Sequence, residues 1–116
     1  MRLLIGLFVG LLAADMTGNW TLRLDPDFSG NQVTKECKIQ QQGDKLTVSC
    51  DPNGKMTGDV KNNRVTLELI TGKKDEIVAR FTAAVNQERS FMKGAWQYTD
   101  PQDKKEKTGR FGLEKR

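Results

Sequence analysis

The side chains best suited to chemistry in this 116-residue sequence are two cysteines, Cys37 and Cys50, because the sequence contains no histidine. Histidine is the side chain that most often transfers protons near neutral pH, and it is also the commonest metal ligand. Two cysteines alone are too few for a structural zinc site. No nucleophile motif and no phosphate-binding loop occurs in the sequence. We therefore expect a protein that is not an enzyme and that uses neither a metal nor a cofactor.

The carboxylates fall mainly in turns and on the polar faces of the expected strands. Three of them precede a proline, at residues 25–26, 51–52 and 100–101. An Asp-Pro dipeptide favours a turn, and none of the three loops has the twelve-residue pattern of a calcium-binding loop. We interpret these loops as turns.

The two cysteines are expected to form a disulfide bond. Residues 43–44, Gly-Asp, suit a two-residue hairpin turn with glycine at the first central position. Such a turn pairs Gln42 with Lys45, and counting back along both strands then pairs Cys37 with Cys50. Directly opposed residues in an antiparallel pair lie within disulfide reach. The alternative is a pair of buried thiols that act as small apolar side chains.

Short stretches of alternating apolar and polar residues fill the chain after residue 17, without a helical period. One apolar and one polar face on every strand is typical of an antiparallel sheet that is solvated on one side. The connections are short enough for hairpins, and closure into a barrel would remove both exposed sheet edges. We therefore predict an all-β fold, an eight-stranded antiparallel up-and-down barrel. The expected strands cover 20–24, 36–40, 45–50, 55–61, 64–69, 76–83, 92–99 and 108–114.

The first 14 residues have the three-part pattern of a signal peptide. A positive start at residues 1–2 precedes an apolar run at 3–12, and Ala13 and Ala14 supply small residues for cleavage. A membrane-spanning helix needs about 20 apolar residues, so we expect no permanent membrane anchor. We predict that residues 1–14 are removed, that residues 15–116 form one barrel domain, and that the protein is secreted or periplasmic. The alternative is an ordinary N-terminal helix, but no later segment offers it a partner.

The charge of the chain is modest, with a formal net charge of +4. Positive and negative side chains are interspersed, so we expect no nucleic-acid partner. The C-terminal part is the most basic segment. It is interpreted either as a solvated loop and strand or as a rim that meets an acidic partner or an anionic lipid surface. Its basic residues are Lys104, Lys105, Lys107, Arg110, Lys115 and Arg116.

The first expected strand opens with Gly18-Asn19-Trp20. This Gly-x-Trp start, followed by an eight-strand meander, resembles the calycin group, which includes lipocalins and avidins. The resemblance implies that Trp20 closes one end of the barrel and that a basic residue from the end of the last strand packs over it. Arg116 is the first candidate for that residue, with Lys115 and Arg110 as alternatives.

The sequence departs from the calycin pattern in two respects. Its expected strands are short, and the Thr-Asp pair at 99–100 falls in the wrong hairpin for the second lipocalin motif. The biotin-binding residues of avidins have no counterpart here. The resemblance therefore implies a barrel and carries over no ligand.

The residues expected inside the barrel combine large aromatic side chains with glycine and alanine. An eight-stranded barrel is just wide enough to be filled by side chains or to hold one small ligand. Glycine weakens a strand, so the inward glycines should have local reasons: room for a neighbouring tryptophan, a sharp bend, or space for a ligand. The residues expected to line a cavity, if they are not simply core, are Met56, Phe81, Met92, Trp96, Tyr98 and Phe111.

A pattern of Met-x-Gly-x-apolar occurs twice, at 56–60 and 92–96. It is either a coincidence between two similar strands or the trace of a duplicated four-strand unit.

These observations predict a monomeric exported binding protein. The expected ligand is a small apolar molecule in the mouth of the barrel, or a protein partner on its rim. The alternative is a protein-interaction module, such as an inhibitor of a secreted enzyme, with a filled core and no cavity. Fold alone does not choose between them.

Overall fold

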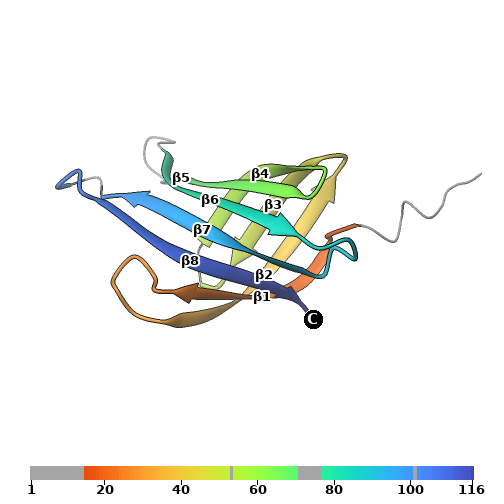
Figure 1. Ribbon diagram of the computed structural model, residues 1–116, viewed down its shortest axis with the longest axis horizontal. Coiled ribbons are helices and arrows are strands. Elements are labelled where there is room, and N and C mark those ends of the chain that lie inside the picture. The colour runs from red at the N-terminus through yellow and green to blue at the C-terminus, as the bar shows by residue number, and fades with distance from the viewer. Residues whose placement is uncertain (1–14, 53, 71–76, 101) are drawn as a thin grey trace, which may run out of the picture.

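Eight antiparallel strands form a closed up-and-down barrel in the computed structural model (Figure 1), which describes residues 15–52, 54–70, 77–100 and 102–116. Each strand pairs with the next, and β8 returns to pair with β1, so the predicted fold class is confirmed. The expected signal peptide, residues 1–14, lies outside the described residues. The strands are β1 (Gly18–Asp25), β2 (Val33–Gln42), β3 (Lys45–Cys50), β4 (Gly54–Lys61), β5 (Arg64–Ile70), β6 (Ile77–Val85), β7 (Phe91–Thr99) and β8 (Glu106–Lys115).

The barrel has two distinct ends. We call the end where β1 begins and β8 finishes the terminal end, and Figure 1 shows the C-terminus there. We call the opposite end, where the chain crosses from β1 to β2, the mouth. Inward side chains from all eight strands fill the space between the two ends with a single apolar cluster. No helix within the described ranges is long and apolar enough to cross a membrane.

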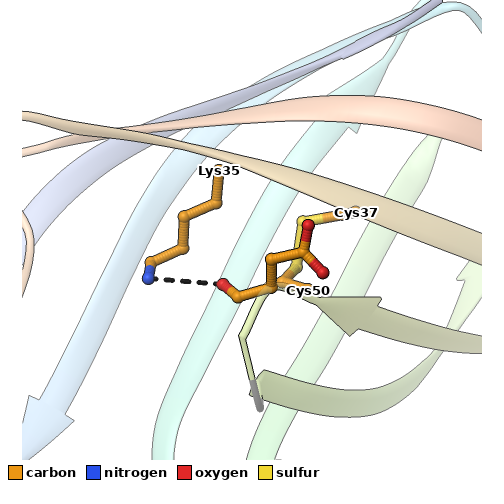
Figure 2. Close-up of a disulfide and its surroundings, with 4 residues drawn as sticks. Lys35, Cys37 and Cys50 are labelled. Carbon is orange, nitrogen blue, oxygen red and sulfur yellow. Dashed lines mark hydrogen bonds between the residues drawn. A yellow bond between two sulfur atoms is a disulfide. The ribbon is translucent and has the colours of Figure 1, made fainter.

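The hairpin of β2 and β3 has the predicted register. Gln42 pairs with Lys45, and Cys37 pairs with Cys50. Gly43 takes a φ of 62°, which suits glycine at the first central position of the turn. The two cysteines form a disulfide bond with an S–S distance of 2.02 Å (Figure 2), so the predicted bond is confirmed.

The disulfide lies beside the start of the β3–β4 turn. Lys35, two residues before Cys37, donates a hydrogen bond from Nζ to the backbone oxygen of Asp51 at 3.5 Å, the dashed line in Figure 2. The backbone N–H of Asp51 donates to the oxygen of Glu36 at 3.0 Å. These contacts hold the turn after β3 against β2, so the covalent link reinforces an existing connection.

The inward glycines have packing reasons. A Cβ at Gly109 would lie 2.4 Å from Cζ2 of Trp96, so this glycine provides room for the indole. A Cβ at Gly58 would lie 1.8 Å from the backbone oxygen of Thr66, and one at Gly94 would lie 1.9 Å from that of Thr82. At these two sites the neighbouring backbone approaches too closely for any side chain. None of the three glycines leaves space for a ligand.

Gly58 and Gly94 are the central residues of the repeated Met-x-Gly-x-apolar pattern. They lie on β4 and β7, which are three strands apart and run in opposite directions. A four-strand duplication would instead relate β4 to β8. The shared pattern therefore reflects a shared need for close strand approach.

Two local details depart from the sequence pattern. Strict alternation through the expected strand at 76–83 predicts that Ile77 faces inward, but Ile77 is 42% exposed and its neighbour Val78 is buried. The cause is an irregularity in the β5–β6 pairing between Leu69 and Ile70, which shifts the register by one residue. Asn-Asn at 62–63 suits a hairpin turn with positive φ at both residues, but of the two it is Asn62 alone that takes a positive φ, 57°.

The disulfide should contribute measurably to stability. It closes a loop with a sequence separation of 13, which the chain-entropy model values at about 3 kcal/mol. We expect a C37A/C50A variant to lose about 2–4 kcal/mol of unfolding free energy in urea denaturation. Wild-type protein under reductant should fall close to the variant. Equal stability of the oxidised wild type and the variant would contradict a structural role for the bond.

A matched pair of glycine substitutions tests the packing of Trp96. Gly109→Ala should lower the free energy of unfolding by about 1–3 kcal/mol, because the new methyl group overlaps the buried indole. Gly112→Ala is the control, since its Cβ would meet only the backbone oxygen of Met92, at 3.7 Å. Urea denaturation measures both, and an equal effect of the two substitutions would show that Gly109 does not serve the indole.

Candidate functional site: the mouth of the barrel

The six residues expected to line a cavity all face the barrel interior, but they do not form one group. Phe81, Trp96 and Tyr98 lie toward the mouth, and Phe111 contacts Phe81 edge-to-face with ring centroids 5.1 Å apart. Met92 lies near the terminal end, because β7 begins beside it. Met56 belongs to β4, on another part of the wall. Five of the six are buried, and Tyr98 is half-buried.

Sequence reasoning missed the residue at the centre of the mouth, Phe28. It belongs to the loop between β1 and β2. Its ring stacks on Tyr98 with centroids 4.3 Å apart and planes 10° apart. It meets Trp96 edge-on at 4.9 Å, and it lies 6.3 Å from Phe81. The signal in the sequence was a single aromatic residue within an otherwise polar loop, but the polar composition led us to interpret the segment only as a turn.

Two hydrogen bonds join the same loop to the barrel. Trp96 donates from Nε1 to the backbone oxygen of Pro26 at 3.0 Å. Lys107, the register partner of Tyr98, donates from Nζ to the backbone oxygen of Phe28 at 3.1 Å. The loop therefore presents one aromatic ring and two acceptor oxygens to an aromatic surface that carries two donors.

Asp27 organises the loop from within. Its Oδ1 accepts hydrogen bonds from the backbone N–H of Ser29 (2.9 Å), the hydroxyl of Ser29 (2.8 Å) and the backbone N–H of Asn31 (2.9 Å). Its own backbone N–H donates to the oxygen of Asn31 at 2.6 Å. The hydrogen bond from the Asn31 backbone, followed by that from the Ser29 side chain, lowers the pKa of the Asp27 carboxyl. The loop is thus a self-supporting turn attached to the barrel through Phe28 and the two backbone oxygens.

The terminal end is closed by the segment before β1. Trp20 is fully buried and donates from Nε1 to the backbone oxygen of Met16 at 2.9 Å. Met16 is also fully buried, and its backbone N–H donates to Oε1 of Gln41 at 2.9 Å. The buried tryptophan and the segment before it therefore seal this end.

Lys115 is the basic residue beside Trp20. The two are register partners, and Nζ of Lys115 donates to the backbone oxygen of Asp15 at 3.2 Å. Gly18, at the start of β1, lies against the Lys115 side chain, since its Cβ would meet Cε at 3.0 Å. Arg116, our first candidate, is exposed and pairs with Glu36 on the outer face. The basic residue next to Trp20 is therefore Lys115, one of the two alternatives to Arg116.

The basic C-terminal residues do not make a common rim. Lys107 lies at the mouth, whereas Lys115 and Arg116 lie at the terminal end. Strand β8 therefore places them toward opposite ends of the barrel.

The surface hollows are open grooves on the outside of the barrel. The one of about 700 Å³ lies over β1 to β4, and outward side chains such as Asn19, Lys38, Ser49 and Lys55 line it. No cluster of three or more metal-ligating side chains occurs within residues 15–52, 54–70, 77–100 and 102–116. Compared with known protein families and with curated proteins, the sequence matches none.

The Asp27 carboxylate should make the loop sensitive to acid. Because its pKa lies below the ordinary value of 3.8, its stabilising contribution is complete above about pH 4 and is lost as the pH falls through the lowered pKa. We expect the near-ultraviolet circular dichroism of the Phe28–Trp96–Tyr98 cluster to change in that range before the barrel unfolds.

Asp27→Asn removes the titrating group and should abolish this early transition. Asp44→Asn, in the β2–β3 turn at the terminal end, is the matched control and should keep it. Persistence of the transition in Asp27→Asn would assign it to another group.

Proposed function

We propose that this chain is an exported binding protein that takes a small, flat aromatic ligand at the mouth, in the place that Phe28 fills in the free protein. The observation that carries the proposal is the stacking of a loop phenylalanine on Tyr98, with centroids 4.3 Å apart. A ring held there by a loop occupies the position that a ligand ring would take.

The packing of the interior explains why the ligand would replace Phe28 instead of lying deeper. Trp96 and Phe81 are only 1% and 3% exposed, and Gly109 leaves no space beside the indole. A deeper ligand would have to displace core side chains, each of which contributes several kcal/mol to stability. Moving the loop breaks only the contacts of one ring and two hydrogen bonds.

The two hydrogen bonds indicate the chemistry of the ligand. When the loop leaves, Nε1 of Trp96 and Nζ of Lys107 lose their acceptors. Trp96 is buried, so leaving its Nε1 without a partner beneath a ligand would cost about 1–3 kcal/mol. Lys107 is exposed, so water can replace its acceptor and an acceptor on the ligand is a smaller gain there. A ligand that carries acceptor oxygens beside its ring would satisfy both groups. An anionic oxygen would suit the ammonium group best, so the preferred class is an aromatic acid.

Export and the family resemblance support the same proposal. The disulfide bond is typical of proteins that fold in an oxidising compartment, which fits a secreted or periplasmic location. The closed eight-stranded barrel is compatible with the calycin group, a resemblance that carries over no ligand, and a barrel of this size is wide enough to hold one small ligand.

The second candidate is a protein-interaction module with a filled core. The closure of both ends favours it, at the terminal end by Met16 and Trp20 and at the mouth by Phe28. In that case Phe28 is a permanent part of the core and partners meet only the outer surface.

Anilinonaphthalene sulfonate tests the first candidate, because it is a flat aromatic anion that becomes fluorescent in an apolar site. We expect Phe28→Ala to bind it about tenfold more tightly than the wild type. The substitution removes a competing ring whose aromatic contacts contribute about 0.5–1.5 kcal/mol each, and 1.4 kcal/mol corresponds to tenfold. Adding Tyr98→Ala to Phe28→Ala should reverse most of this gain.

Phe91→Ala is the matched control, since Phe91 is a partly exposed phenylalanine near the terminal end, 42% exposed. It should bind the probe like the wild type. Lys107→Met in the Phe28→Ala background should weaken binding of the sulfonate but not of the uncharged anilinonaphthalene. No saturable binding by any folded variant would reject the mouth site and favour the interaction module.

A further inference from the structure

A row of cationic side chains crosses the outer face of six of the eight strands. Its members are Arg23 on β1, Lys93 on β7, Arg64 on β5 and Lys61 on β4, and we call it the cationic row. Arg23 and Lys93 both pair with Gly112 of β8, Lys93 and Arg64 both pair with Ala84 of β6, and Arg64 pairs directly with Lys61. All four cations are exposed.

Small residues separate the cations and leave hollows between them. Gly112 lies in the floor of a hollow of about 440 Å³ that Arg23 and Lys93 border. Ala84 borders another of about 570 Å³, together with Arg64 and Lys61. Neighbouring strands are about 4.8 Å apart, so Arg23, Lys93 and Arg64 recur at about 9–10 Å. The row therefore alternates charge and open space along one line.

The cations of the row are not neutralised within the described part of the chain. The ion pairs formed there are Arg80–Glu68 and Arg116–Glu36, and neither includes a member of the row. Asp25 and Glu114 also line the hollow over Gly112, and Asp59 lines the hollow beside Ala84, but within the described ranges none of the three forms an ion pair with the row.

One pair in the row costs stability. Lys61 and Arg64 are directly opposed across β4 and β5, and like charges in this position are destabilising. Arg89 adds a further cation to this hairpin, donating from its guanidinium to the backbone oxygen of Asn62 at 2.7 Å. An arrangement that opposes folding and concentrates one charge points to a binding role, because binding sites often sacrifice stability.

The shape of the row restricts its partner. A row that follows six of the eight strands curves around more than half of the barrel, so a flat lipid surface can meet only part of it. Among the residues that the structure describes, Phe91 is the one exposed aromatic side chain beside the row, whereas single-stranded nucleic acids are usually held by stacking on several. A closed barrel has no free strand edge with which a peptide backbone could pair.

We propose that the cationic row binds a linear anionic polysaccharide that carries carboxylate or sulfate groups. A flexible chain can follow the curved surface, its acidic groups can meet successive cations, and its sugar rings can occupy the hollows over Gly112 and Ala84. This site is separate from the mouth and does not depend on the ligand proposed there.

Binding of a fluorescently labelled, sulfated heparin oligosaccharide tests the proposal, with affinity measured by fluorescence anisotropy on the full mature chain. We expect saturable binding at low salt that weakens at least tenfold between 50 and 200 mM salt, because the contacts are charge-dominated and solvent-exposed. Lys93→Gln with Arg64→Gln should weaken binding at least tenfold.

The matched control is Lys38→Gln with Lys55→Gln. These two exposed lysines also lie two strands apart with a small residue, Ser49, between them, and their removal changes the net charge equally. The control should change affinity less than twofold. An equal loss of affinity in both double variants would show that binding depends only on the net charge of the protein, and it would overturn the proposal.

The variant Arg64→Glu distinguishes a loss of binding from a loss of folding. It replaces a like-charge pair with an opposite-charge pair, so the midpoint of thermal unfolding should rise while oligosaccharide binding is lost. Single-stranded DNA, polyglutamate and vesicles with anionic lipid serve as competing partners. Tighter binding of any of these than of the oligosaccharide, with the same dependence on Lys93 and Arg64, would assign the row to that partner instead.

Discussion

The packing of Trp96 against Gly109 is the contact on which the mouth depends. The indole lies where a Cβ of residue 109 would be, so its position is set by the pairing of β7 with β8. From there its N–H reaches the backbone oxygen of Pro26 and its edge meets the ring of Phe28. One buried side chain thus connects the barrel wall to the loop that covers the mouth. A larger residue at 109 would shift the indole, and the loop would lose both contacts together.

The barrel and its disulfide could be predicted because both follow from local rules. The period of two separates inner from outer residues, and the turn at 43–44 then determines which residues oppose each other across β2 and β3. Phe28 could not be found in this way. Its contacts with Tyr98 and Trp96 join residues about 70 positions apart, and no pattern around Phe28 indicates them. The shifted register near Ile77 has a similar origin, since one irregularity exchanged the faces of two neighbouring apolar residues.

The cationic row was also hidden in the sequence, for a related reason. Its four residues come from four strands, and they form a line only when the registers of five strand pairs are combined. The basic C-terminal segment shows the converse, because its residues are close together in the chain but far apart on the barrel. Lys107 and Arg116 are close in the chain, but β8 carries them to opposite ends of the barrel. In an up-and-down barrel, residues that are register partners on successive strands share a surface, whatever their distance apart in the chain. Clusters of charge along the chain are therefore a poor guide to charged surfaces.

A filled barrel and a binding function are compatible if the ligand competes with part of the protein. The affinity for such a ligand is its intrinsic affinity multiplied by the fraction of molecules in which the loop is open. If Phe28 were displaced in about 1% of molecules, apparent binding would be about a hundredfold weaker than in a preformed site. The loop also determines what is excluded, because a ligand must recover the ring stacking and both hydrogen bonds that it breaks. An apolar molecule without acceptor oxygens would leave Nε1 of the buried Trp96 without an acceptor and would gain nothing from the exposed Lys107 ammonium, so it would bind less well than Phe28. The loop that closes the mouth would in this way select for the aromatic acids whose features it reproduces.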